Sequence, residues 1–213
     1  MKRSMMAAVG VAGCFALQNA SAGWIDWTST TAGTMDVGGS SVGVTMTGSA
    51  LGLVNGDYYY NSASTGGTSA SGTYAGMAPS DLIQVNAPST FTLTFDQTVN
   101  DLYMALVSVG QPGYGVTYDF SDAFTVVSYG ANYWGYGGYS VAGDNLTGSE
   151  FNGILHFAGA FDSITFSTNP IENWHGFNFS SNELSTTSVP EPASLALLGL
   201  GLAGFAAARK RKA

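Results

Sequence analysis

The chain has 213 residues, of which 45% are hydrophobic, 13% are aromatic and only 9% are charged. This much apolar surface favours a folded protein over a disordered one, in spite of the abundant glycine and serine. All six Lys and Arg residues lie near the two ends, and none occurs between Ser4 and Ala208, a span that contains all fourteen acidic residues. Because nucleic-acid binding requires basic side chains against phosphates, this composition excludes nucleic-acid and phosphorylated partners for the body.

The first 22 residues have the pattern of a secretion signal. Lys2 and Arg3 form a basic start, residues 5–17 are mostly apolar, and Ala20 and Ala22 are the small residues that a signal peptidase reads. We therefore expect residues 1–22 to be a signal peptide that is cleaved after Ala22, and we expect the protein to be exported.

Lipoprotein processing at Cys14 is an alternative, because residues 11–14 (Val-Ala-Gly-Cys) resemble a lipobox. The apolar run continues past Cys14 to Leu17, and small residues follow at a normal distance, which favours ordinary cleavage. Cys14 is the only cysteine of the chain. After cleavage the body would hold no disulfide, no cysteine-ligated metal and no cysteine nucleophile.

The body between the terminal segments has the pattern of antiparallel β-structure. Residues 41–47 and 90–95 alternate apolar and polar side chains, residues 102–109 form an apolar run suited to a buried strand, and Asp96 to Asp101 is expected to be a polar turn. Further short strands are expected at 116–120, 124–129, 154–157, 161–166 and 176–179. We predict an all-β antiparallel sandwich or jelly roll over residues 23–180, followed by a linker over 181–188.

Two histidines and a few acids are the candidates for catalysis. His156 lies between Leu155 and Phe157, so a strand that buries those two residues points His156 outward. His175 follows Glu172 closely enough for the carboxylate to orient it. A hydrolase would require a facing pair of carboxylates, for which the candidates are Glu150, Asp162 and Glu172. No nucleophile elbow or zinc-binding helix accompanies them, so the body is predicted to be non-enzymatic.

A structural calcium ion is a second use of the acids. Hard cations prefer carboxylate and carbonyl oxygens, and several acids lie beside glycine- and asparagine-rich loops. The EF-hand spacing is absent from the sequence. The candidate ligands are Asp119, Asp122, Asp144, Glu150 and Asp162.

Aromatic side chains in glycine-rich stretches give the clearest indication of a partner. Tyr133, Trp134 and Tyr136 crowd one such stretch, and Trp174 lies near the end of the body. Exposed Tyr and Trp rings are suited to stacking on the C–H faces of sugars while their polar tips remain in water. Carbohydrate binding is therefore one hypothesis, and packing of these rings over a sheet edge or in a subunit contact is the alternative.

The C-terminus has an apolar segment over residues 193–208, directly followed by a basic cluster. A helix of that length rises roughly 24 Å, which is short of the roughly 30 Å of bilayer hydrocarbon. The basic cluster would act as a stop-transfer signal on the cytoplasmic side. It consists of Arg209, Lys210, Arg211 and Lys212.

Residues 189–213 resemble the PEP-CTERM sorting signal of Gram-negative bacteria. The resemblance rests on Pro190, Glu191 and Pro192, the short apolar helix and the basic end. It implies recognition by an exosortase-type membrane enzyme that processes the chain near the Pro-Glu-Pro motif, and an association with exopolysaccharide and biofilm. A plain single-pass membrane anchor is the alternative.

Together these observations predict a protein that passes through the inner membrane to the outer surface or the extracellular matrix. There the body would be non-enzymatic and would bind exopolysaccharide, while the transmembrane helix would hold a membrane intermediate. A secreted carbohydrate-active hydrolase is the alternative function.

Overall fold

A computed structural model describes residues 23–54, 77, 81–130 and 137–184. They form one open antiparallel sheet of 13 strands, which confirms the all-β antiparallel class. The strands are β1 (Gly23–Trp24), β2 (Asp26–Ser29), β3 (Ala32–Val37), β4 (Ser40–Thr47), β5 (Gly52–Leu53), β6 (Ile83–Val85), β7 (Ser89–Val109), β8 (Val116–Phe120), β9 (Thr125–Tyr129), β10 (Tyr139–Ala142), β11 (Asn145–Gly148), β12 (Phe151–Asn169) and β13 (His175–Leu184).

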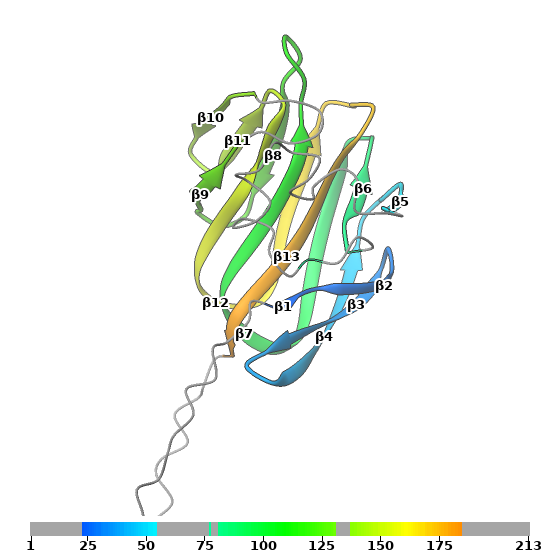
Figure 1. Cartoon of the computed structure of the whole chain (residues 1–213), viewed down its shortest axis with the longest axis vertical. Coiled ribbons are helices and arrows are strands. Elements are labelled where there is room, and N and C mark those ends of the chain that lie inside the picture. The colour runs from blue at the N-terminus through cyan, green and yellow to red at the C-terminus, as the bar shows by residue number, and fades with distance from the viewer. Residues whose placement is uncertain (1–22, 55–76, 78–80, 131–136, 185–213) are drawn as a thin grey trace, which may run out of the picture.

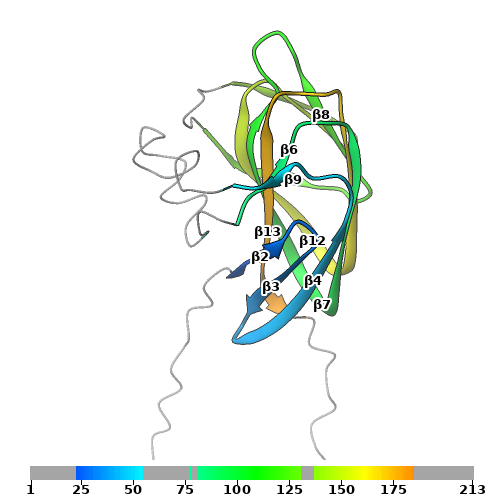
Figure 2. The same cartoon turned by 90° about the vertical axis from the view of Figure 1, so that its right-hand side faces the viewer.

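Two long strands, β7 and β12, run through both halves of the sheet. Residues 99–109 of β7 pair with β13 and with the early part of β12, which also pairs with β9. Residues 89–94 of β7 pair with the late part of β12, and these two segments are flanked by β4 and β8. The sheet therefore folds over on itself through β7 and β12, and its two halves face each other (Figure 2).

The bend in these strands explains why the predicted turn at residues 96–101 is wrong. β7 is continuous through this segment, and the pairing of β7 with β12 shifts register on both sides of Phe161. Asp101 has a positive φ of 51° and its Oδ1 accepts the backbone N–H of Gly159 at 3.1 Å. The polar residues mark a bulged corner where the strands pass between the halves, and bulges bend and twist strands in this way.

An aromatic core fills the space between the facing halves. Phe166 of β12 lies on one half and its ring centroid is 5.1 Å from that of Phe177 and 5.9 Å from that of Phe179, both on β13 of the other half. Phe120 and Phe157 meet across the same space at 5.1 Å. These rings are buried, so apolar burial between the halves holds the fold together.

A second, smaller core covers the outer face of the half that contains β13. Alternate residues of β7 point to opposite sides: Met104 and Leu106 join the main core, whereas Ala105 and Val107 join the outer cluster with Ile154. Burial on both faces explains why residues 102–109 are an apolar run rather than an alternating one. The other buried members of the outer cluster are Trp24, Val54, Met77 and Leu82.

The end of the body lies further along the chain than the predicted boundary at residue 180. β13 continues to Leu184, and Glu183 and Leu184 pair with Asn100 and Val99 of β7. The Ser181 hydroxyl is buried and donates to the backbone carbonyl of Asn100 at 2.6 Å. Polar composition indicated a linker here, but small hydroxyl side chains fit a buried strand when they have hydrogen-bond partners.

Candidate functional site

Three connections meet at the end of the sheet opposite Leu184, where β13 begins (Figure 1). They are the connection between β7 and β8, whose tip is a tight turn and which is called the β7–β8 hairpin below although the two strands do not pair, the turn between β11 and β12, and the loop between β12 and β13. The hairpin tip closes with reciprocal backbone hydrogen bonds between Gln111 and Tyr114, at 2.9 and 2.8 Å. Pro112 and Gly113, which has a φ of 82°, occupy the two central positions with the residue types of a type II turn.

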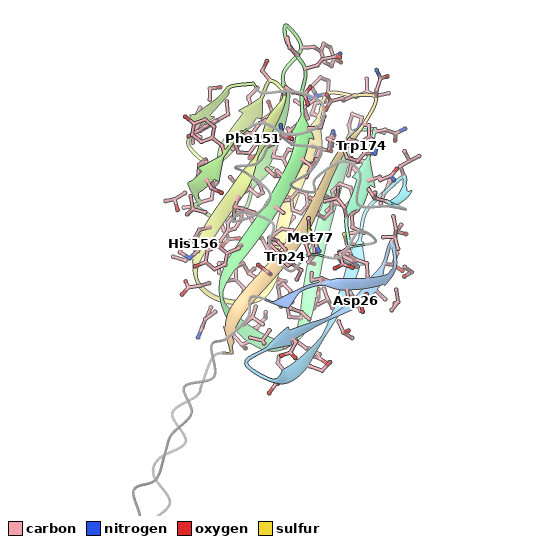
Figure 3. All side chains as sticks on the ribbon, viewed as in Figure 1. Trp24, Asp26, Met77, Phe151, His156 and Trp174 are labelled. Carbon is pink, nitrogen blue, oxygen red and sulfur yellow. The ribbon has the colours of Figure 1, made fainter. Side chains whose placement is uncertain are left out.

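A hollow of about 250 Å³ lies among these connections. The loop before β13 supplies a carboxylate, an amide and an indole, the other two connections supply an amide and a second carboxylate, and the end of β7 supplies a hydroxyl. Trp174 lies at this end of the molecule together with Phe151 (Figure 3). The residues that line the hollow are Ser108, Gln111, Glu150, Glu172, Asn173 and Trp174.

Glu172 is fixed in position by two donors. Its Oε2 accepts the backbone N–H of Gly110 at 2.9 Å and lies 3.0 Å from Nδ1 of His175. The side chain is only 5% exposed, and the Glu172 N–H donates to the backbone carbonyl of Asn86 at 3.3 Å. The carboxylate therefore ties the β7–β8 hairpin to the start of β13, and the predicted orientation of His175 by Glu172 is confirmed.

Glu150 is the second carboxylate of the hollow, and it is also largely buried. Its Oε1 accepts the Ser108 hydroxyl at 2.7 Å, and the Ser108 N–H donates to Oδ1 of Asn152 at 2.6 Å. Burial raises the pKa of Glu150; the Ser108 hydrogen bond partly opposes this, and the negative charge of Glu172 adds to it. Ser108 and Glu150 have positive φ values of 57° and 64°, an uncommon conformation for residues other than glycine.

Three acids were candidates for a facing pair of carboxylates. The structure brings Glu150 and Glu172 to one hollow and places Asp162 elsewhere. Asp162 lies on β12 and accepts a hydrogen bond from the Thr98 hydroxyl near the bend. Ser108 was not predicted as part of the site. Ser108 lies in an apolar run, so nothing in the local sequence indicates a polar function. The pairing of β7 with β12 shifts register between Phe151 and Gly153, opposite Ser108, and the sequence does not reveal this shift.

The side of the His175 ring that points away from Glu172 lies in the core. Its ring lies 5.5 Å from that of Tyr118 in an edge-to-face arrangement. Among the described residues, His175 Nε2 and the Tyr118 hydroxyl are buried and have no hydrogen-bond partner. Burial raises the pKa of Tyr118 well above its ordinary value, and the charge of Glu172 raises it further. The phenol therefore stays neutral throughout the physiological pH range.

His156 is half-buried rather than fully outward as predicted. Leu155 and Phe157 are buried as expected, but the His156 ring stacks on Tyr103 with centroids 4.7 Å apart. Its Nε2 lies 3.4 Å from Oδ1 of Asp101. A large ring on the neighbouring strand covers the face that the alternation pattern assigned to solvent, and His156 lies well away from Trp174 (Figure 3).

The acids proposed for calcium do not come together at one site. Within the described ranges there is no group of three or more His, Cys, Asp or Glu side chains that could hold a metal ion. Glu150 lies in the hollow, Asp162 lies near the bend, and Asp119 is exposed on β8.

Only one of the four proposed sugar-binding aromatic residues falls within the described chain. Trp174 is half-buried; one part of it lines the hollow and another packs against the outer cluster. Tyr133, Trp134 and Tyr136 lie outside the described residues, as do the signal peptide with Ala20 and Ala22 and the basic cluster Arg209 to Lys212.

The described fold defines an open all-β domain with a hollow at one end. Residues 188–212, which include Pro190, Glu191 and Pro192, match the family described as the PEP-CTERM protein-sorting motif. The predicted C-terminal resemblance is therefore confirmed: the chain carries the sorting signal of an exported, cell-surface sorted protein, and the motif implies processing by exosortase. No curated protein and no solved structure matches the chain.

The expected transmembrane helix over residues 193–208 lies outside the described residues. In the part of the chain that the structure describes, no helix has the length and apolar character needed to cross a membrane.

Proposed function

We propose that this protein is a non-enzymatic surface or matrix protein whose body binds a saccharide of the surrounding exopolysaccharide in the hollow at the start of β13. The observation that carries the proposal is the combination of Trp174 with Ser108, Gln111, Asn173 and two carboxylates in one concave site. Concave sites with an aromatic wall and a few convergent polar groups are the usual form of small-ligand sites. We also class the folded sheet as a sandwich whose two layers are joined through β7 and β12.

The chemistry of the hollow suits sugar hydroxyls. Carboxylate oxygens accept hydrogen bonds from hydroxyls, and the side-chain amides of Gln111 and Asn173 both donate and accept. The indole of Trp174 offers an apolar surface for the C–H face of a sugar ring, with an N–H at its edge. Since Gln111 and Asn173 are exposed, a ligand can reach them without a change in the fold.

The position of the hollow also supports a surface role. β13 begins at the hollow and ends at Leu184 at the opposite end of the molecule (Figure 1), and the sorting motif starts at residue 188. A body attached through that motif would carry its hollow on the side away from the attachment point.

Two features of Glu172 support binding rather than catalysis. Its Oε2 already accepts hydrogen bonds from Gly110 and His175, and these bonds hold two connections together. A carboxylate with this structural task has one oxygen left for a ligand, which is sufficient for a hydrogen bond to a hydroxyl.

The test is affinity electrophoresis of the full-length protein, in mild detergent, through gels that contain neutral polysaccharides. We expect retardation of the wild type and of Trp174→Phe, which keeps an aromatic face, and loss of retardation in Trp174→Leu, which keeps most of the apolar packing. Leu51→Ala, at an exposed position outside the hollow, is the control. Equal retardation of Trp174→Leu and the wild type would contradict the proposed site, provided that both melt as folded proteins.

A carbohydrate-active hydrolase is the second candidate, favoured by one observation. Glu150, whose pKa is raised by burial, faces the hollow that Glu172 also lines, and two carboxyl groups in one hollow, one of them with a raised pKa, are the arrangement that a glycosidase uses for its general acid and its partner. Release of reducing ends from a polysaccharide by the wild type, abolished in Glu150→Gln, would establish this alternative. Binding with no release supports the non-enzymatic proposal.

A further inference from the structure

We propose that the saccharide site continues beyond the first hollow, and that the protein binds an internal segment of a linear polysaccharide that lacks acidic groups. This inference rests on the proposed function and names its ligand class. The observation that carries it is a second hollow that shares one wall with the first, with an aromatic side chain in each of the two.

The second hollow has a volume of about 380 Å³ and adjoins the first, because the two share lining residues. Its shared wall consists of Gln111, Glu172 and Asn173, which also line the first hollow. The far wall consists of Asn86, Tyr114 and Ile171. A ligand that occupies both hollows must therefore pass over the shared residues, whereas a single sugar unit can occupy only one side.

The sizes of the hollows favour such an extended ligand. Sites for small ligands usually have volumes of roughly 300–1,000 Å³, and the first hollow alone, at about 250 Å³, is below that range. The second hollow, at about 380 Å³, lies at the lower end of that range. The first hollow by itself is thus a small site, and occupation of the second supplies additional contact area.

Tyr114 gives the second hollow an aromatic wall that is held in place. Its hydroxyl donates to the backbone carbonyl of Ile171 at 2.9 Å, which links the hairpin tip to the loop before β13. The ring remains 39% exposed. The groove thus has Trp174 in one arm and Tyr114 in the other, with the amides of Gln111 and Asn173 between them. Rings in both arms can pack against sugar units at different places along one chain, and the amides can bond to hydroxyls between those units.

Charge restricts which polysaccharide can enter. Glu150 and Glu172 line the groove, and no Lys or Arg occurs between Ser4 and Ala208. A chain of uronic acids or sulfated sugars would bring like charges against these carboxylates without any fixed cation to compensate, and like-charge juxtaposition is costly. The groove therefore selects against polyanionic chains.

Binding of linear gluco- and manno-oligosaccharides, from disaccharide to octasaccharide, tests this inference by calorimetry on the full-length protein in mild detergent. We expect affinity to rise with chain length until both arms are filled. Tyr114→Ala should weaken binding of the long oligosaccharides by about tenfold, which corresponds to roughly 1.4 kcal/mol, and should weaken binding of the shortest ones less, so that the gain in affinity with chain length is reduced. Tyr114→Phe, which keeps the ring, should lie much closer to the wild type.

Two further comparisons separate the possible outcomes. A long oligosaccharide with its reducing end converted to an alditol should bind as well as the unmodified one, and an oligogalacturonate of equal length should not bind. Affinity that is constant with length, or a Tyr114→Ala variant that binds long chains normally, would overturn the two-armed groove while leaving the proposed function in place. Failure of the wild type to bind any oligosaccharide would instead overturn the proposed function.

Discussion

Replacement of Glu172 by alanine should destabilise the body, because this carboxylate accepts hydrogen bonds from two buried or nearly buried donors. The Gly110 N–H and His175 Nδ1 lie 2.9 and 3.0 Å from its Oε2. A buried polar group left without a partner costs about 1–3 kcal/mol, so two of them cost about 2–6 kcal/mol. Since domains unfold with about 5–15 kcal/mol, the loss is a large part of the total. At about 2–4 °C per kcal/mol for a domain of this size, the melting temperature should fall by roughly 4–24 °C.

Thermal unfolding of the full-length protein, followed by circular dichroism, measures this change. Asp119→Ala is a matched control, because it also removes an acid but from an exposed position on β8; its effect should stay within about 0.5 kcal/mol. Glu172→Gln should lie near the wild type, since the amide oxygen can still accept both hydrogen bonds. If Glu172→Ala melted like Asp119→Ala, the assignment of Glu172 as the link between the β7–β8 hairpin and β13 would be wrong.

Three further predictions address the acid of the hollow, the core and the tail. The pKa of Glu150 is raised in the folded state, so its protonation stabilises the fold at pH values below its ordinary pKa of about 4.3, and this contribution is lost as the pH rises through the folded-state pKa. In urea unfolding between about pH 4 and 7, the free energy of unfolding of the wild type should therefore fall relative to that of Glu150→Gln. Parallel pH profiles of the two proteins would refute this. Phe166→Ala, at a position 1% exposed between the two halves, should cost about 3–5 kcal/mol in denaturant unfolding, and a cost below about 1 kcal/mol would mean that the halves do not pack through this ring. Replacement of Pro190, Glu191 and Pro192 by alanine should leave full-length protein in the inner membrane, as seen by fractionation and mass, whereas an unchanged mature mass would count against processing at the motif.

Much of the fold could be predicted because its strands bury one face or two. Residues 41–47 alternate and became β4, with Val42, Val44 and Met46 buried. Residues 102–109 form an apolar run and became a segment of β7 that is covered on both sides. In both cases the order of apolar and polar residues along the strand reflects which of its faces are buried, and this order is the main structural signal in a single sequence.

The long bent strands could not be predicted in the same way. The polar segment at residues 96–101 has the composition of a turn, yet the chain continues through it as a strand, with residues 95–98 not paired to β12, opposite Asp162, and with Asp101 opposite the bulge of β12 at Gly159. Whether polar residues form a turn or a corner depends on the partner strand, which lies about 60 positions along the chain. The predicted end of the body at residue 180 was too early for the same reason. Ser181 is buried because its hydroxyl donates to the backbone carbonyl of Asn100 on β7, a partner that the local sequence does not indicate.

The site was predicted in part for a similar reason. Glu172 and His175 are close in sequence, so their pairing could be expected. Glu150 and Ser108 meet only through the pairing of β7 with β12, and the two-armed groove depends on how the hairpin at Gln111 and Tyr114 lies against the loop before β13. Such long-range contacts follow from topology, not from local pattern.

The most direct measurement of the central claim is an NMR titration of the isotope-labelled full-length protein with a neutral linear oligosaccharide. The saccharide-binding proposal predicts that the backbone amides of Gly110, Asn173 and His175 and the indole N–H of Trp174 shift with a common dissociation constant. The amides of Gly38 and Gly39, in the β3–β4 turn, should not shift. Saturable shifts confined to the β3–β4 turn, or no saturable shifts around Trp174 with any neutral oligosaccharide, would contradict the claim that this end of the sheet is a saccharide-binding site.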